Sequence, residues 1–164
     1  MSPYKPTQTV LISSRAHLKN RFSEHTEIKD NIITLGWHMK TSHNPFLYAI
    51  SVGKTRYSLS LIRKSKVFVV NFMPIELKDK VVFCGKTSGE TIDKFQASGL
   101  HKEDAESVDC PRIMEALGYL ECEVVNEVET GDHILFIGKV IKSILKREGK
   151  RIFQTDDDFT TTIK

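Results

Sequence analysis

The stretch Leu120–Val125, LECEVV, alternates apolar residues with glutamate at two of its three intervening positions, and the turn residues Gly131–Asp132 separate it from Ile134–Ile141, ILFIGKVI. A period of two is the pattern of a strand with one buried face, and Gly-Asp is typical turn chemistry. The segment therefore predicts a long antiparallel hairpin. The apolar run after the turn predicts that the second strand is largely buried.

Other strands are expected where apolar, β-branched and aromatic residues gather, at Val10–Ile12, Ile32–Met39, Phe46–Val52 and Val67–Val70. The second and third of these flank Thr41–Pro45, a run of residues that turns prefer. The fourth is apolar on both faces, as expected of a buried central strand.

Short helices are expected between the strands, at Ser58–Lys64, Gly89–Ala97 and Pro111–Ala116. The first begins at a serine that can cap it, and the third begins with proline in a first-turn position. Residues 15–31 are polar and charge-rich and are expected to form a loop or an irregular helix. Many strands with short helical insertions predict a mainly β barrel. The chain also lacks the glycine-rich loop of dinucleotide-binding α/β folds.

The bulk composition indicates one ordinary globular unit. The 164 residues are 40% hydrophobic and 27% charged, which predicts a single domain over residues 1–164. The net charge of +3 is compatible with a phosphate-bearing ligand but too small to indicate nucleic acid. No apolar run is long enough for a membrane span, and the N-terminus lacks an apolar signal core. Three cysteines with no paired spacing indicate neither a disulfide framework nor a zinc site, so a reducing cytoplasm is expected.

The segment Ser51–Ser58 is a candidate anion site. A strand ends there, a turn with Gly53 follows, and a helix begins at Ser58, so free N–H groups and the helix dipole favour an anion. Arg56 adds a planar fork that grips phosphate in two places. The alternative is a plain capped helix with a solvated arginine, and the residues alone favour it modestly.

Three more groups of residues could carry chemistry. Trp37–Ser42 offers an aromatic face beside polar groups, as a ring-shaped ligand requires, although a core tryptophan is the commoner explanation. Cys84–Gly89 lacks the residue order of a P-loop, and Cys84 follows an apolar run that favours simple burial. His133 lies at the predicted hairpin turn, where it can reach a ligand or a second subunit, or remain solvated.

Taken together, several segments resemble the flavin reductase-like family of FMN-binding split barrels, closest to the flavoredoxin branch. Their order and spacing hold from about residue 31 to 140. The matching segments are Asn31–Lys40, Asn44–Ser51, Arg56–Ser58, Phe68–Asn71, Cys84–Gly89, Asp93–Phe95 and Gly131–Gly138.

The resemblance implies a six-stranded antiparallel split barrel that forms a homodimer, with one FMN per subunit near the interface. It implies flavin contacts from Trp37, His38, Met39 and Lys40 at one strand end, from Ser51 and Val52 on the next strand, and from Asn71. It implies that Arg56, Tyr57 and Ser58 bind the phosphate. Cys84, Ser88 and His133 would line the flavin or nicotinamide side, partly from the neighbouring subunit, and His133 is the candidate catalytic residue.

Two segments depart from the family pattern. Residues 15–30 are longer than a short turn, and Phe153–Phe159 lacks the histidine and paired glycines often found in that tail. The expected function is hydride transfer from NAD(P)H to flavin. The alternatives are an electron carrier that exchanges electrons with a protein partner, and a split barrel that binds another cofactor such as haem.

Overall fold

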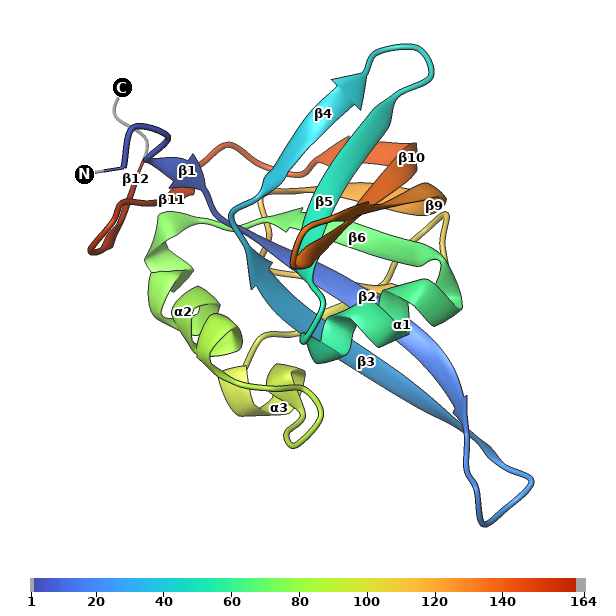
Figure 1. Ribbon diagram of the computed structural model, residues 1–164. Helices are drawn as coiled ribbons and strands as arrows, with labels where there is room; N and C mark the ends of the chain where they lie inside the picture. The colour runs from blue at the N-terminus through green and yellow to red at the C-terminus, as the bar shows by residue number, and fades with distance from the viewer. Residues whose placement is uncertain (1, 162–164) are drawn as a thin grey trace.

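The computed structural model describes residues 2–161, and its centre is a curled antiparallel sheet of seven strands (Figure 1). In spatial order the strands are β3 (Thr26–Leu35), β2 (Val10–Lys19), β6 (Val67–Phe72), β9 (Gly118–Thr130), β10 (His133–Leu145), β5 (Leu47–Gly53) and β4 (His38–Ser42). The expected mainly β, antiparallel class is confirmed, with seven strands in this sheet rather than six. The barrel is open because β3 and β4, at the two ends of the order, are not paired with each other.

Smaller elements surround this sheet. One short sheet contains β1 (Thr7–Gln8), β11 (Ile152–Gln154) and β12 (Phe159–Thr161). A second short sheet pairs β7 (Lys102–Asp104) with β8 (Pro111–Ile113). The helical elements are α1 (Tyr57–Ser65), a 3-10 turn at Ile75–Leu77, α2 (Lys78–Lys86) and α3 (Lys94–Ser98). Because β1 pairs with β11, the N-terminal segment lies beside the C-terminal one.

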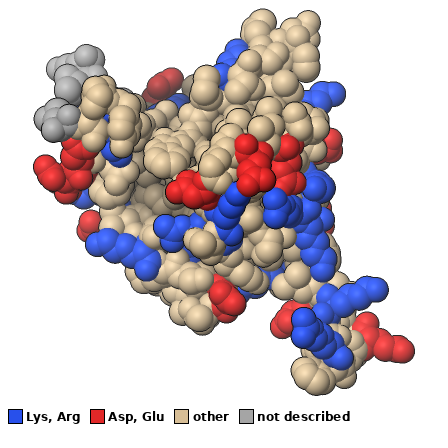
Figure 2. All heavy atoms as spheres, viewed as in Figure 1, with Lys and Arg blue, Asp and Glu red and all other residues tan. Residues whose placement is uncertain are grey.

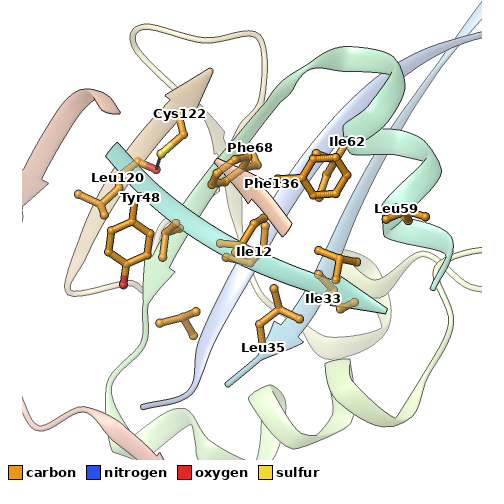
Figure 3. Close-up of a cluster of buried hydrophobic side chains, with 14 of the residues drawn as sticks. Ile12, Ile33, Leu35, Tyr48, Leu59, Ile62, Phe68, Leu120, Cys122 and Phe136 are labelled. Carbon is orange, nitrogen blue, oxygen red and sulfur yellow. Dashed lines mark hydrogen bonds between the residues drawn. The ribbon is translucent and has the colours of Figure 1, made fainter. Parts of the chain in front are cut away.

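The barrel interior is filled by aliphatic and aromatic side chains from the strands and from α1 (Figure 3). Phe68 and Phe136 are fully buried there. A Cβ atom at Gly138 would lie 2.6 Å from Cζ of Phe68, so only glycine lets β10 pass this close to the ring. A second cluster lies on the other side of β6, where Val69 packs with residues of α2 and α3. Since β6 is covered on both faces, the run Val67–Val70 is apolar throughout, as the sequence predicts.

The predicted hairpin is confirmed: β9 and β10 pair antiparallel across the turn at Gly131–Asp132. The expectation of a largely buried second strand was wrong, because burial alternates along the first half of β10 and its second half is mostly exposed or half-buried. Only Ile134, Phe136 and Gly138 of the strand are buried, all pointing inward.

Residues 15–31 do not form a loop or an irregular helix, so that expectation was wrong. Most of them form the outer parts of β2 and β3, which pair continuously from Val10↔Leu35 to Lys19↔Thr26, and residues 20–25 form the turn that joins the two strands. Figure 1 shows this hairpin projecting beyond the body of the protein. Its polar composition reflects two solvent-facing sides, a pattern that sequence periodicity does not distinguish from a loop.

One helix prediction was wrong, and another was correct only for part of its range. Pro111–Ala116 begins with β8, and Ser13 Oγ donates a 2.5 Å hydrogen bond to the Pro111 carbonyl. Within Gly89–Ala97 the helix begins only at Lys94, where Asp93 caps it. Helix α2, which contains the apolar run Val81–Phe83, was not predicted as a separate element from the sequence. No helix within residues 2–161 is long and apolar enough to cross a membrane.

An ion-pair network fixes the base of the projecting hairpin. The Arg15 guanidinium donates to both carboxylate oxygens of Asp30, at 2.7 and 3.2 Å, and Lys102 donates to Asp30 at 2.7 Å. Burial acts to raise the pKa of Asp30, but the hydrogen bonds and charges of Arg15 and Lys102 hold it below its ordinary value. This carboxylate therefore stabilises the fold above about pH 4, and the contribution is lost as the pH falls through the lowered folded pKa.

Replacing Asp30 by asparagine is expected to lower the free energy of unfolding by about 3 kcal/mol at pH 7, because it leaves the nearly buried guanidinium of Arg15 with only its exposed partners Asp104 and Asp109. Denaturant unfolding at pH 7 and at pH 3 measures the effect, and the difference between variant and wild type should shrink at pH 3. Asp157→Asn, in the exposed turn before β12, is the matched control and should change little. An equal loss at both pH values would contradict the electrostatic explanation.

Candidate functional site

A cavity of about 420 Å³ lies along the free edge of β3, on the side where the barrel is open. Its walls come from β3, the end of β5, the start of α1, the segment from α2 to α3, and the segments that contain Lys5 and Gln154. The lining residues of β3 run from Asn31 to Leu35, a span of about 13 Å at the usual strand rise. The unpaired edge of β3 offers backbone N–H and C=O groups to anything bound there.

One end of the cavity is built to receive negative charge. Arg56 is the N-cap of α1, the helix has no side-chain cap and no acidic residue in its first turn, and Tyr57 and Ser58 line the cavity. The guanidinium of Arg56 has no hydrogen-bond or ion-pair partner within residues 2–161. Free N–H groups at a helix start and an unpaired arginine together form an anion site.

Asn31 closes the inner wall at this end. Its Nδ2 donates a 2.9 Å hydrogen bond to Ser58 Oγ, while its buried Oδ1 has no partner. A Cβ atom at Gly89 would lie 2.0 Å from that oxygen, so only glycine lets the segment after α2 lie against the amide. The side chain of Lys94 also lines this region, where it is 4% exposed.

The cavity lining next to Arg56 is aromatic and polar, since a Cβ atom at Gly53 would lie 3.9 Å from Arg56 Nε and 3.7 Å from His133 Nε2. The rings of Trp37 and His133 lie with their centroids 4.6 Å apart, and Trp37 is half exposed. His133 Nδ1 is 2.5 Å from the Asp132 carboxylate, an interaction that holds the pKa of Asp132 below its ordinary value. Across the opening, Lys5 Nζ donates a 3.1 Å hydrogen bond to Gln154 Oε1.

The charge lining the cavity has one sign. Lys5, Arg56 and Lys94 are among the described lining residues, and no aspartate or glutamate is among them. Figure 2 shows a different pattern on the surrounding surface, where basic and acidic side chains alternate. The exposed pairs include Lys54–Glu129 and Arg63–Glu127. A cavity with unpaired cations inside a surface of paired charges favours an anionic ligand.

The structure brings eight of the predicted site residues together around this cavity. They come from the four predicted groups, and they are Trp37, Ser51, Arg56, Tyr57, Ser58, Cys84, Ser88 and His133. Cys84 is fully buried, and burial raises the pKa of its thiol. The thiol is therefore a wall of the cavity rather than an activated nucleophile.

Five other predicted site residues lie outside the cavity. Val52 is fully buried in the barrel interior. Asn71 is also buried, with Nδ2 donating to Leu11 O at 3.0 Å and Oδ1 accepting from the Ile113 N–H at 2.9 Å. These contacts give Asn71 a structural task, joining β6 to β2 and β8.

The remaining three are on β4. His38 points inward, within 2.7 Å of the Tyr48 hydroxyl and 2.8 Å of the Gln8 carbonyl, and burial lowers its pKa. Met39 and Lys40 are exposed, Met39 at 62%. Neither side chain lines the cavity of its own chain.

Sequence reasoning did not single out several lining residues. Asn31 and Lys94 fall within segments that carry the family resemblance, so a signal for them existed. No sequence signal existed for Lys5 and Gln154, because they come close together only through the pairing of β1 with β11, which lie near opposite ends of the chain.

The fold and the site together define an open antiparallel barrel with a cavity at its gap, whose described lining carries cations and no carboxylate. The flavin reductase like domain family matches residues 5–159, so the chain belongs to this family. An uncharacterised protein of Archaeoglobus fulgidus is 39% identical over 113 residues, which cover 69% of this chain and 64% of that protein. The match therefore covers slightly less than two thirds of that relative's length.

Solved structures share the fold at low sequence identity. Flavoredoxin of Desulfovibrio vulgaris (Miyazaki F) has a TM-score of 0.83 at 21% identity, over 100% of this chain and 93% of that chain. An FMN-binding protein from Thermus thermophilus with bound 1-cyclohex-2-enone has a TM-score of 0.82 at 22% identity, over 97% of this chain and 88% of that chain. These likenesses confirm the split-barrel fold of flavin reductases.

Proposed function

We propose that this protein binds FMN without a covalent link and acts as an NAD(P)H-dependent flavin reductase. The observation that carries the proposal is one cavity that is lined both by a cationic helix start and by an aromatic pair. Membership of the flavin reductase like domain family supports it.

The residues of the cavity suit the separate chemical parts of FMN. Arg56, Ser58 and the first N–H groups of α1 would hold the phosphate. The edge of β3 and the unpartnered Oδ1 of Asn31 suit the hydroxyl-rich chain, since that oxygen still needs a donor. Trp37 and the nearby polar groups would bind the ring. The volume of 420 Å³ is within the range of about 300–1,000 Å³ typical of small-molecule sites.

When bound, the isoalloxazine ring supplies the redox chemistry, accepting hydride from a nicotinamide and passing electrons on. The protein's residues have three tasks: to bind the phosphate, to orient the ring, and to leave one face open to the donor. None of these tasks requires a general acid or base. A cavity whose described lining contains no carboxylate is compatible with that mechanism.

The colour and reduction of the purified protein test the proposal. Flavin absorption, and its bleaching by NADH or NADPH without air, would support it. A protein that fails to bind added FMN, or that shows a haem spectrum, would contradict it. Steady-state oxidation of NAD(P)H with added free flavin separates a reductase from a carrier that keeps its FMN and exchanges electrons with a protein partner.

A homodimer is part of the proposal, because the cavity opens beside an apolar outer face. Strand pairing places Met39, Ala49 and Ile137 in one row across β4, β5 and β10. Ser51, Leu135 and Val128 form the next row. The Ser51 N–H donates to the Trp37 carbonyl at 3.0 Å, so this face continues directly to the cavity. A second copy docked here would add a wall to a cavity that is otherwise open.

His133 is the candidate contact for the nicotinamide donor, because its ring lies at the opening beside Trp37. His133→Ala is expected to raise the KM for NAD(P)H about fivefold while FMN affinity stays nearly unchanged, as loss of one hydrogen bond predicts. Stopped-flow reduction of bound FMN across donor concentrations measures the effect. His101→Ala, which removes an exposed histidine paired with Glu115, is the matched control. Identical donor dependence in wild type and His133→Ala would mean that His133 is a bystander.

A further inference from the structure

Lys94 is a buried lysine with an incomplete set of partners. Its side chain is 4% exposed, and Nζ donates 2.8 Å hydrogen bonds to the carbonyls of Ile32 and Cys84. An ammonium group has three donors, so one remains without an acceptor within residues 2–161. No carboxylate pairs with it among these residues, and burial lowers its pKa. A buried cation left in this condition is destabilising unless something else supplies negative charge.

The position of Lys94 shows where that charge would come from. Its acceptor Ile32 follows Asn31 on β3, and Asn31 is hydrogen-bonded to Ser58 in the first turn of α1. Lys94 and Arg56 line the same cavity and are close enough for their charges to repel. Two neighbouring cations and the free N–H groups at the start of α1 therefore line the same cavity.

We infer that Lys94 is the second cation of a site for a terminal phosphate dianion, approaching it from the inner wall while Arg56 approaches from the helix start. The inference rests on the proposed binding of FMN. A phosphate monoester carries nearly two negative charges at neutral pH, so one arginine leaves part of that charge uncompensated. Each phosphate of a flavin dinucleotide carries only one, and its adenylate extends beyond. Lys94 thus makes the site selective for FMN over FAD and over riboflavin.

A purely structural lysine would give a different result. Tying the Ile32 carbonyl to the Cys84 carbonyl shapes the whole cavity, so its loss would weaken every flavin to the same extent. A phosphate-binding lysine changes the affinity for FMN selectively. The ratio of the riboflavin and FMN dissociation constants is therefore the decisive quantity.

The experiment titrates wild type, Lys94→Gln and Lys94→Arg with FMN, FAD and riboflavin, following flavin fluorescence. Glutamine keeps a donor for the two carbonyls but removes the charge, and arginine restores the charge. We expect Lys94→Gln to weaken FMN binding by about tenfold or more while riboflavin affinity is unchanged, and Lys94→Arg to recover the preference for FMN. Lys80→Gln is the matched control, because Lys80 also donates to a carbonyl, that of Gly99, but lies outside the cavity.

Equal losses for FMN and riboflavin in Lys94→Gln, or no loss for either, would overturn the role of Lys94 while leaving the proposed function intact. If Lys94→Gln does not fold, Lys94→Arg still tests the phosphate-binding role of Lys94. A folded Lys94→Arg variant that has lost the preference for FMN would also overturn that role. Failure of the wild type to bind FMN would overturn the proposed function and this inference together.

Discussion

Arg56→Ala is expected to weaken FMN binding roughly tenfold to a hundredfold and to leave riboflavin binding nearly unchanged. The guanidinium lies at the start of α1 and has no hydrogen-bond or ion-pair partner within residues 2–161, so its loss breaks no such interaction of the protein itself. One charge-assisted contact to phosphate contributes about 1.5–3 kcal/mol, which corresponds to that range of affinity. Equilibrium titration with both flavins measures it.

Another arginine of the same helix provides the control. Arg63 lies in the last turn of α1, pairs with Glu127 and does not line the cavity. Arg63→Ala changes the net charge by the same amount and should leave FMN affinity unchanged. Equal affinity of the wild type for FMN and riboflavin would refute the phosphate assignment. A parallel fall for both flavins in Arg56→Ala would instead indicate damage to the cavity.

The sequence predicted the parts of the fold that local pattern determines. The pairing of β9 with β10 follows from alternation and a Gly-Asp turn, both written within about twenty residues of chain. The run Val67–Val70 could be recognised as a central strand because both of its faces are apolar. In each case the signal lies in the segment itself.

The failures occur where structure depends on distant residues. The outer hairpin of β2 and β3 has little apolar alternation, and Arg15 is held by Asp30 on the facing strand, a pairing that no local window contains. Pro111 begins β8 because Lys102–Asp104 pairs with it, although proline also suits a helix start. Tertiary contacts determined the structure of both segments, the outer hairpin and β8.

The candidate site divides in the same way. The start of α1 at Arg56 and Ser58 has local chemistry that can be recognised in sequence. At the start of β4, by contrast, the position of each residue relative to the sheet determines whether its side chain faces the cavity, the barrel interior or the outer face. Trp37 lines the cavity, His38 points into the barrel interior, and Met39 points to the outer face. Adjacent residues of a strand point to opposite faces of the sheet. A prediction that assigns all four residues from Trp37 to Lys40 to one site therefore includes side chains that face different parts of the protein.

Met39→Glu is expected to separate the proposed homodimer and, with it, to release FMN. Met39 is 62% exposed in one chain, so a charge there should not disturb the fold of the monomer. In a symmetric dimer each substitution occurs twice, and an unpaired charge buried at an interface costs about 3 kcal/mol. The dissociation constant of the dimer should therefore rise by roughly a thousandfold or more.

Sedimentation velocity of wild type and variant, each with FMN, measures both association and the flavin that travels with the protein. Met114→Glu is the matched control, because Met114 is also exposed, at 44%, but lies after β8 and away from the outer face of β4, β5 and β10. A wild type that sediments as a monomer at micromolar concentration would refute the dimer. A monomeric Met39→Glu that keeps FMN with unchanged affinity would show that one chain closes the cavity alone, since the row from Met39 to Ile137 would then contribute nothing to the bound flavin.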